Sequence, residues 1–142
     1  MNGPSAGVPL FINARLDAFL MEDAIPEKAL DDTVERASAF AQAGADCVYP
    51  ISPADEETVR ALGERIQAPI NILAGPHALP LTIYREIGIE RVSLGPFVFR
   101  AGVGQFMRIV RELRAEGTYG AFGSGSPSQS DLARLLDDEH EV

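Results

Sequence analysis

The sequence has little cysteine and few basic residues, and each shortage excludes a class of function. One cysteine, Cys47, stands among 142 residues. A single thiol excludes an internal disulfide framework and a cysteine-rich zinc site, and it suits a reducing compartment. Twelve basic residues against 21 acidic ones give a net charge of −9, which argues against binding to nucleic acid. We therefore expect a cytoplasmic protein with no nucleic-acid partner.

Long apolar runs and a basic leader are lacking as well. No stretch approaches the roughly 20 apolar residues of a membrane span, and the opening MNGPSAGVPLF has neither the basic region nor the apolar centre of a signal peptide. We expect a soluble protein with no membrane partner. The length, with 46% apolar residues, fits one globular domain.

Short apolar runs alternate with segments whose apolar residues recur every three or four positions. Strands are predicted at residues 9–13, 46–49, 70–73 and 91–94. Helices are predicted around residues 30–41, 59–66, 79–87, where Gly88 ends the helix, and 103–113. This order predicts parallel strands joined by helical crossovers. Consecutive bulky residues such as Phe11 and Ile12 predict strands buried on both faces.

The fold class is therefore predicted to be α/β, with four βα units over residues 1–119. A Gly/Ser-rich linker and a short C-terminal helix are expected over residues 120–142. A flavodoxin-like domain would show the same alternation, but it needs a five-stranded switch point that the sequence does not show.

In parallel α/β folds the functional groups collect where the strands end and the following loops begin. The residues expected there are Asn13, Arg15, Asp17, Ser52, Asp55, Asn71, Gly75, His77, Ser93, Gly95 and Pro96. Arg15 is the strongest candidate, because a guanidinium grips a carboxylate or phosphonate with two hydrogen bonds and stays charged at any working pH. A structural ion pair between Arg15 and Asp17 is the open alternative.

Asn71 and Gly95 each allow two interpretations. Asn71 is a polar amide among apolar neighbours, so it should be hydrogen-bonded either to a substrate or to the protein backbone. Gly95 precedes the longest predicted helix, whose free amides could hold an anion. Gly95-Pro96 is equally an ordinary strand-to-helix turn.

Four segments, taken in order, resemble the later half of the isocitrate lyase and phosphoenolpyruvate mutase family over residues 8–125. They are FINARLDAFL, AQAGADCVYP, APINILAGP and GIERVSLGPFVFRAG. The resemblance implies the last four units of a (β/α)8 barrel, with PLFINARLDA as the fifth strand. It also implies an enzyme that makes or breaks C–C or P–C bonds in small α-keto, dicarboxylic or phosphonate acids with Mg²⁺.

The resemblance assigns roles by position. Arg15 matches the family arginine that binds substrate carboxylate or phosphonate, and Asn13 lies in the same motif. Asn71 matches a polar residue at the end of the seventh strand, and Ser93 and Gly95 match the end of the eighth.

The sequence departs from the family where the metal is bound. The family's metal-binding aspartates and mobile catalytic loop belong to the first four units, so Mg²⁺ is implied with no ligands in this chain. Ile51 stands where the family has a glutamate or a histidine.

Four barrel strands alone would leave open edges and an apolar inner face. We therefore expect a homo-oligomer whose copies close a barrel, a partner that supplies the first half, or a truncated product. The functional alternative to a lyase or mutase is a non-catalytic half-barrel for assembly or anion binding.

Overall fold

The computed structural model describes residues 9–21, 25–51, 55–123 and 125–137. Some of the predictions fall outside the described residues. These are the candidate Ser52, the first eight residues of the expected barrel half, and residues 124 and 138–142 of the expected linker and tail. The chain forms two compact units that divide between Phe97 and Val98. The domain boundary expected after residue 119 stays a prediction. The two units are defined by how compactly the chain packs, which does not show where an independently folding domain ends.

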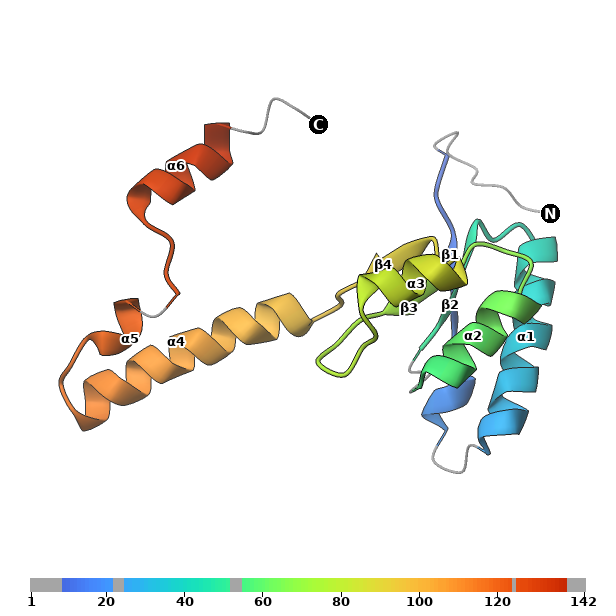
Figure 1. Ribbon diagram of the computed structural model, residues 1–142, viewed down its shortest axis with the longest axis horizontal. Coiled ribbons are helices and arrows are strands. Elements are labelled where there is room, and N and C mark those ends of the chain that lie inside the picture. Colours follow the sequence, from blue (N-terminus) through green and yellow to red (C-terminus); the bar gives the residue numbers. More distant parts are fainter. Residues whose placement is uncertain (1–8, 22–24, 52–54, 124, 138–142) are drawn as a thin grey trace. The chain divides into compact units, whose positions relative to one another are not determined.

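The first unit alternates strands and helices, which confirms the α/β class (Figure 1). In order its elements are β1 (Asn13–Leu16), the 3-10 helix η1 (Ala18–Leu20), α1 (Pro26–Gln42), β2 (Cys47–Pro50), α2 (Glu56–Arg65), β3 (Asn71–Leu73), α3 (Leu81–Ile87) and β4 (Arg91–Ser93).

The strands are parallel, as predicted. In β1 and β2, Asn13 lies opposite Cys47, and in β3 and β4, Asn71 lies opposite Arg91. A single bridge from Val48 to Ile70 joins the two pairs. The strand order is therefore β1-β2-β3-β4, the order in which the strands occur in the chain.

The core lies on one face of these strands. Leu16, Val48, Ile70 and Ile72 pack in one cluster with residues of the first three helices, which include Ala37 of α1, Val59 and Leu62 of α2, and Tyr84 of α3. All four strand residues carry even numbers, because successive side chains of a strand point to opposite faces.

The prediction that both faces are buried holds for β2 and β3, where Cys47 and Asn71 on the face away from the core are 1% and 0% exposed, but it is wrong for the first strand. Phe11 and Ile12 are 65% and 51% exposed, and Arg15 on the face away from the core is also exposed. The guanidinium of Arg91 lies 5.7 Å from the centre of the Phe11 ring, so side chains from β4 and from the segment before β1 meet.

The first strand begins four residues later than predicted, at Asn13 rather than at residue 9. Ile12 donates its N–H to the Asp46 carboxylate, and its carbonyl accepts from Asp46 and Cys47. The strand pairing starts only beyond this cap. As a correction to the prediction, Arg15 lies within β1 and not in the loop after it.

The helix ends follow local rules. Asp55 caps α2 by accepting from the Thr58 amide at 2.8 Å, as expected of an aspartate at this position. Pro26 occupies the first turn of α1. Gly88 ends α3 with φ of 90°, as predicted.

The second unit is helical. It contains α4 (Phe97–Ala115), which begins at the last residue of the first unit, α5 (Gly120–Gly123) and α6 (Gln129–Asp137). Helix α6 lies where the sequence predicts a short C-terminal helix, and α5 lies within the expected Gly/Ser-rich linker. In the described part of the chain, no helix combines the length and apolar character needed to cross a membrane.

Glu112 explains how a Gly-rich segment forms α5. Its carboxylate accepts from the amides of Gly120 and Ala121, each at 2.6 Å, and from the Thr118 hydroxyl. Amides at a helix start have no partner within the helix, and Glu112 supplies two of those partners.

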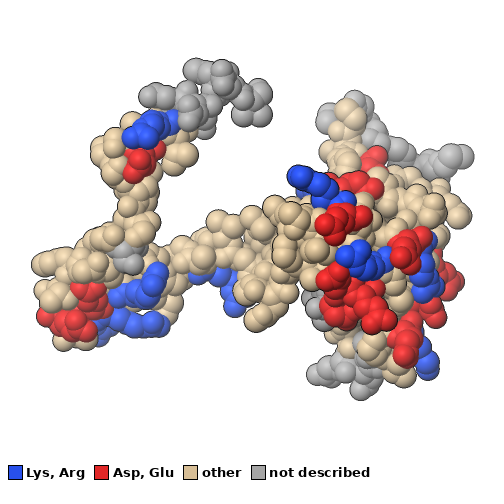
Figure 2. Space-filling model, in the orientation of Figure 1, with Lys and Arg blue, Asp and Glu red and all other residues tan. Residues whose placement is uncertain are grey.

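Charges are distributed unevenly between the two units. Acidic side chains gather over the first unit in the view of Figure 2, where several pair with arginines of α1 and α2. Helix α4 carries four arginines and one glutamate in its 19 residues.

We expect Leu62→Ala to lower the free energy of unfolding by about 2–5 kcal/mol, because it empties a fully buried site of the core. Urea denaturation measures the effect. Leu81→Ala is the matched control, since Leu81 is 67% exposed at the start of α3 and should change the free energy by less than about 1 kcal/mol. Equal effects of the two substitutions would contradict the core described here.

The Thr118 hydroxyl and the two amides hold the pKa of Glu112 below its usual value of 4.5. The stabilising effect of a lowered pKa is present above the usual value and is lost as the pH falls through the lowered one. The NMR signal of the Gly120 amide should therefore titrate with a midpoint below 4.5. Glu112→Gln should abolish that titration and accelerate amide exchange at Gly120, whereas Glu116→Gln should change neither.

Candidate functional site

The family resemblance places five residues at the substrate site, and four of them, Asn13, Arg15, Asn71 and Ser93, lie on the sheet face away from the core. We call this surface the polar face and define it by the odd-numbered strand residues, which are Asn13, Arg15, Cys47, Tyr49, Asn71, Leu73, Arg91 and Ser93. Strand alternation places these residues on one side. Gly95 follows β4 in the turn that leads to α4.

The strand register aligns one row across the polar face. Arg15 lies opposite Tyr49, and Asn71 lies opposite Arg91. The bridge from Val48 to Ile70 continues the register from Tyr49 to Asn71. Arg15 and Asn71 are thus two strands apart, which corresponds to roughly 10 Å between their backbones.

Arg15 forms an ion pair with Asp17. Its Nε donates to the Asp17 Oδ1 at 2.6 Å, and the two side chains are 58% and 53% exposed. An ion pair this exposed contributes about 1 kcal/mol or less to stability. The pair uses Nε alone, and within the described residues the two terminal nitrogens of the guanidinium have no partner. Asp17 can therefore orient Arg15 and still leave a two-nitrogen edge for an anion.

Asn71 and Ser93 are in direct contact. The Ser93 hydroxyl donates to the Asn71 Oδ1 at 3.0 Å, and the Asn71 side chain is fully buried. Within the described part of the chain, Asn71 Nδ2 is buried without a hydrogen-bond partner. Asn71 is the first residue of β3 and Ser93 is the last residue of β4, which corrects the expected position of Asn71 at a strand's end.

Asn13 and Gly95 are the remaining residues that the family resemblance places at the site. Asn13 opens β1, and its Oδ1 is also buried without a partner among the described residues. Gly95 has φ of 51°, and a Cβ at that position would lie 2.8 Å from Leu73 Cδ1. The turn after β4 therefore favours glycine for its backbone conformation, and a Cβ there would also displace the end of the Leu73 side chain.

Tyr49 was missed by the sequence reasoning. It lies between Arg15 and Asn71 in the aligned row and is partly buried. The parallel pairing of the first two strands could have identified Tyr49 as the neighbour of Arg15. The predicted first strand covers residues 9–13, however, and so does not contain Arg15.

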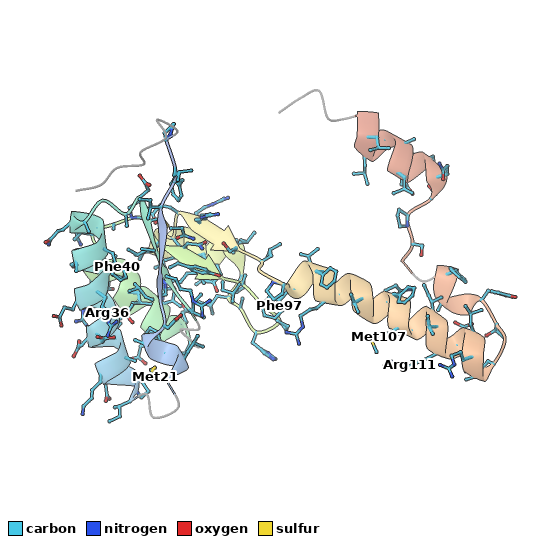
Figure 3. All side chains as sticks on the ribbon, turned by 180° about the vertical axis from the view of Figure 1, so that it is seen from behind. Met21, Arg36, Phe40, Phe97, Met107 and Arg111 are labelled. Atoms are coloured by element: carbon cyan, nitrogen blue, oxygen red, sulfur yellow. The ribbon has the colours of Figure 1, made fainter. Side chains whose placement is uncertain are left out.

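A cavity of about 270 Å³ opens beside the carboxyl ends of β2 and β3, and its wall includes Asp55, Gly75, His77, Tyr84 and Phe97, the last of which is labelled in Figure 3. Asp55, Gly75 and His77, which were expected among the functional groups at the strand ends, line it, whereas Asn13, Arg15, Asn71, Ser93 and Gly95 do not. The Asp55 carboxylate caps α2, and the Tyr84 hydroxyl accepts from the Leu79 amide. With these polar groups engaged in the fold, the polar face remains the better site.

The described residues contain no group of three histidine, cysteine, aspartate or glutamate side chains placed to hold a metal ion. The residues present therefore do not fit a Mg²⁺ site. What the polar face offers is hydrogen-bond donors and positive charge, the chemistry of anion recognition.

Three sequence matches relate this chain to known proteins. The family model described as phosphoenolpyruvate phosphomutase matches residues 2–114. A 2-methylisocitrate lyase of Aeropyrum pernix is 29% identical over 113 residues, which cover 75% of this chain and 37% of that protein. An uncharacterised protein of Mycobacterium tuberculosis is 31% identical over 94 residues, 66% of this chain and 35% of that one. This chain spans about a third of the length of these relatives.

Solved structures give the same relation. A lyase/mutase structure from Burkholderia cenocepacia has a TM-score of 0.77 and 30% identity over 94% of this chain and 47% of its own. An oxaloacetate acetylhydrolase solved with its product oxalate has a TM-score of 0.65 at 17% identity, over 89% of this chain and 42% of its own. The second likeness concerns the fold alone.

We expect Cys47 to react slowly with a thiol reagent such as DTNB. Burial raises the pKa of the Cys47 thiol, and the charge of Arg91 only partly opposes this effect. The reactive thiolate is therefore scarce in the folded chain. The rate at pH 8 should rise at least about tenfold when urea unfolds the protein. An equal rate in the folded and unfolded states would contradict the burial of Cys47.

Proposed function

This chain belongs to the phosphoenolpyruvate phosphomutase family, and from that premise we propose that it supplies the substrate-anion site of a lyase or mutase. The proposed substrates are small α-keto, dicarboxylic or phosphonate acids, and the proposed reaction makes or breaks a C–C or P–C bond. The observation that carries the proposal is the free two-nitrogen edge of Arg15 on the polar face, with Asn71 in the same row.

Charge and donor chemistry favour such a substrate. A guanidinium edge matches the two oxygens of a carboxylate or phosphonate, and it remains charged at any physiological pH. Asn71 Nδ2 is a buried donor without an acceptor in the described residues. A buried donor without a hydrogen bond lowers the stability of the fold, and an oxygen of a bound ligand would supply the missing acceptor. An acid held by Arg15 provides oxygens on the same face.

The metal that the family resemblance implies is not assigned to this chain. Its described residues do not fit a Mg²⁺ site, so the proposal gives the chain the tasks of binding and orienting the acid. The bond-breaking step belongs to the complete enzyme.

We further propose that the chain works in an assembly, in the cytoplasm, as a homo-oligomer or with a partner that supplies the first barrel half. In the described residues, β1 and β4 each leave one edge without a neighbouring strand. Open edges and exposed apolar residues favour association, and Leu10, Phe11, Ile12 and Leu94 are all more than half exposed.

We expect Arg15→Ala to weaken oxalate binding at least about tenfold, because it removes the bidentate partner of a carboxylate. Isothermal titration calorimetry of the full chain gives the dissociation constant, and native mass spectrometry of the same sample gives its assembly. Arg15→Lys should recover only part of the affinity, since an ammonium lacks the planar two-nitrogen edge.

Arg36→Ala is the matched control. Arg36 pairs with Asp32 through its own Nε at 2.8 Å and is as exposed as Arg15, but it lies on α1 away from the polar face. Its substitution should leave oxalate binding unchanged. Equal losses in the Arg15 and Arg36 variants would show a general charge effect and would contradict the proposed site.

A further inference from the structure

The Asn71 side chain is fixed at one end and free at the other. Its Oδ1 accepts from the Ser93 hydroxyl at 3.0 Å, and its Nδ2 is buried without a partner among the described residues. A carboxamide has an acceptor end and a donor end of nearly the same shape. The end that faces a ligand therefore decides whether the site attracts or repels an anion.

Ser93 is well placed to hold this amide. It is the last residue of β4 and lies opposite Leu73 in the register, so it is the diagonal neighbour of Asn71 on the same face. The chain turns immediately afterwards through Gly95, whose φ is 51°. A position in a paired strand holds a side chain more rigidly than a position in a loop.

An anion makes the orientation of the amide important. With Oδ1 bonded to the Ser93 hydroxyl, the Nδ2 donor is available to a carboxylate or phosphonate oxygen. In the reversed orientation Nδ2 would donate to the Ser93 oxygen, and the lone pairs of Oδ1 would face the negative charge and repel it. A bound anion therefore favours the orientation in which the Ser93 hydroxyl donates. Without the Ser93 hydroxyl, Oδ1 loses its donor and the amide is free to turn about its terminal torsion.

We propose that Ser93 is a positioning residue: it binds no substrate itself and acts by presenting Asn71 Nδ2 as a donor to the anion. This inference rests on the proposed function, and it replaces the direct substrate contact that position in the family motif implies for Ser93. It also defines the ligand atom opposite Asn71 as an unprotonated oxygen.

The test combines oxalate titration with NMR of the Asn71 side-chain amide in the full chain. Ser93→Ala should weaken oxalate binding about fivefold, the effect of losing one hydrogen bond between neutral groups. Ser93→Thr keeps the hydroxyl and should bind within about twofold of the wild type. Ser38→Ala, on the exposed side of α1, is the control and should change nothing.

The NMR signal separates positioning from a general structural effect. Oxalate should shift the Asn71 side-chain NH₂ resonances in the wild type and in Ser93→Thr, and should shift them less in Ser93→Ala. Should Ser93→Ala fail to fold, Ser93→Cys takes its place, because the thiol is a weaker donor of similar size.

The experiment distinguishes a failure of the role proposed for Ser93 from a failure of the proposed function. If Arg15→Ala weakens oxalate binding while Ser93→Ala leaves both the affinity and the Asn71 signals as in the wild type, the positioning role is overturned and the proposed function stands. If the wild-type chain binds no oxalate, the proposed function is overturned and the role of Ser93 with it.

Discussion

A strand turns successive side chains to opposite faces, and the short parallel strands of the first unit cannot bury Leu16, Val48 and Ile72 without turning Arg15 and Asn71 the other way. The buried set gives the unit its core against three helices. The opposite set gives it a surface with two guanidinium groups, a phenol and a buried amide. The same register that forms the core therefore assembles the candidate site, and a slip by one residue would destroy both.

Two candidate side chains on the polar face, those of Arg15 and Asn71, are each oriented by a second one. Asp17 engages only one nitrogen of Arg15, and Ser93 engages only the oxygen of Asn71. In each contact a carboxylate or amide oxygen is occupied as the acceptor, while among the described residues the terminal nitrogens of Arg15 and Nδ2 of Asn71 remain free to donate. A surface arranged in this way favours an anion, and this holds for carboxylates and phosphonates alike because both present negatively charged oxygens.

The same strands underlie the proposal that this chain works with a partner. Among the described residues, the outer edges of β1 and β4 carry no neighbouring strand, and apolar side chains beside them are exposed. The matched lyase and mutase structures are about twice as long as this chain. The open edges and the exposed apolar side chains beside them are the observations that support the proposal of a larger assembly.

The sequence by itself determined the α/β class, the parallel order, the family and most of the candidate residues. Periodicity and the NARLDA segment are local signals, and an apolar stripe or a motif can be read without knowing what it packs against. The strand limits and the partners of Arg15, Tyr49 and Asn71 were decided only by the tertiary structure. Residues 9–12 are as apolar as a strand, yet a strand exists only where a neighbour accepts its hydrogen bonds. For the same reason the contact between Asn71 and Ser93 depends on a register between distant segments, which no local pattern encodes.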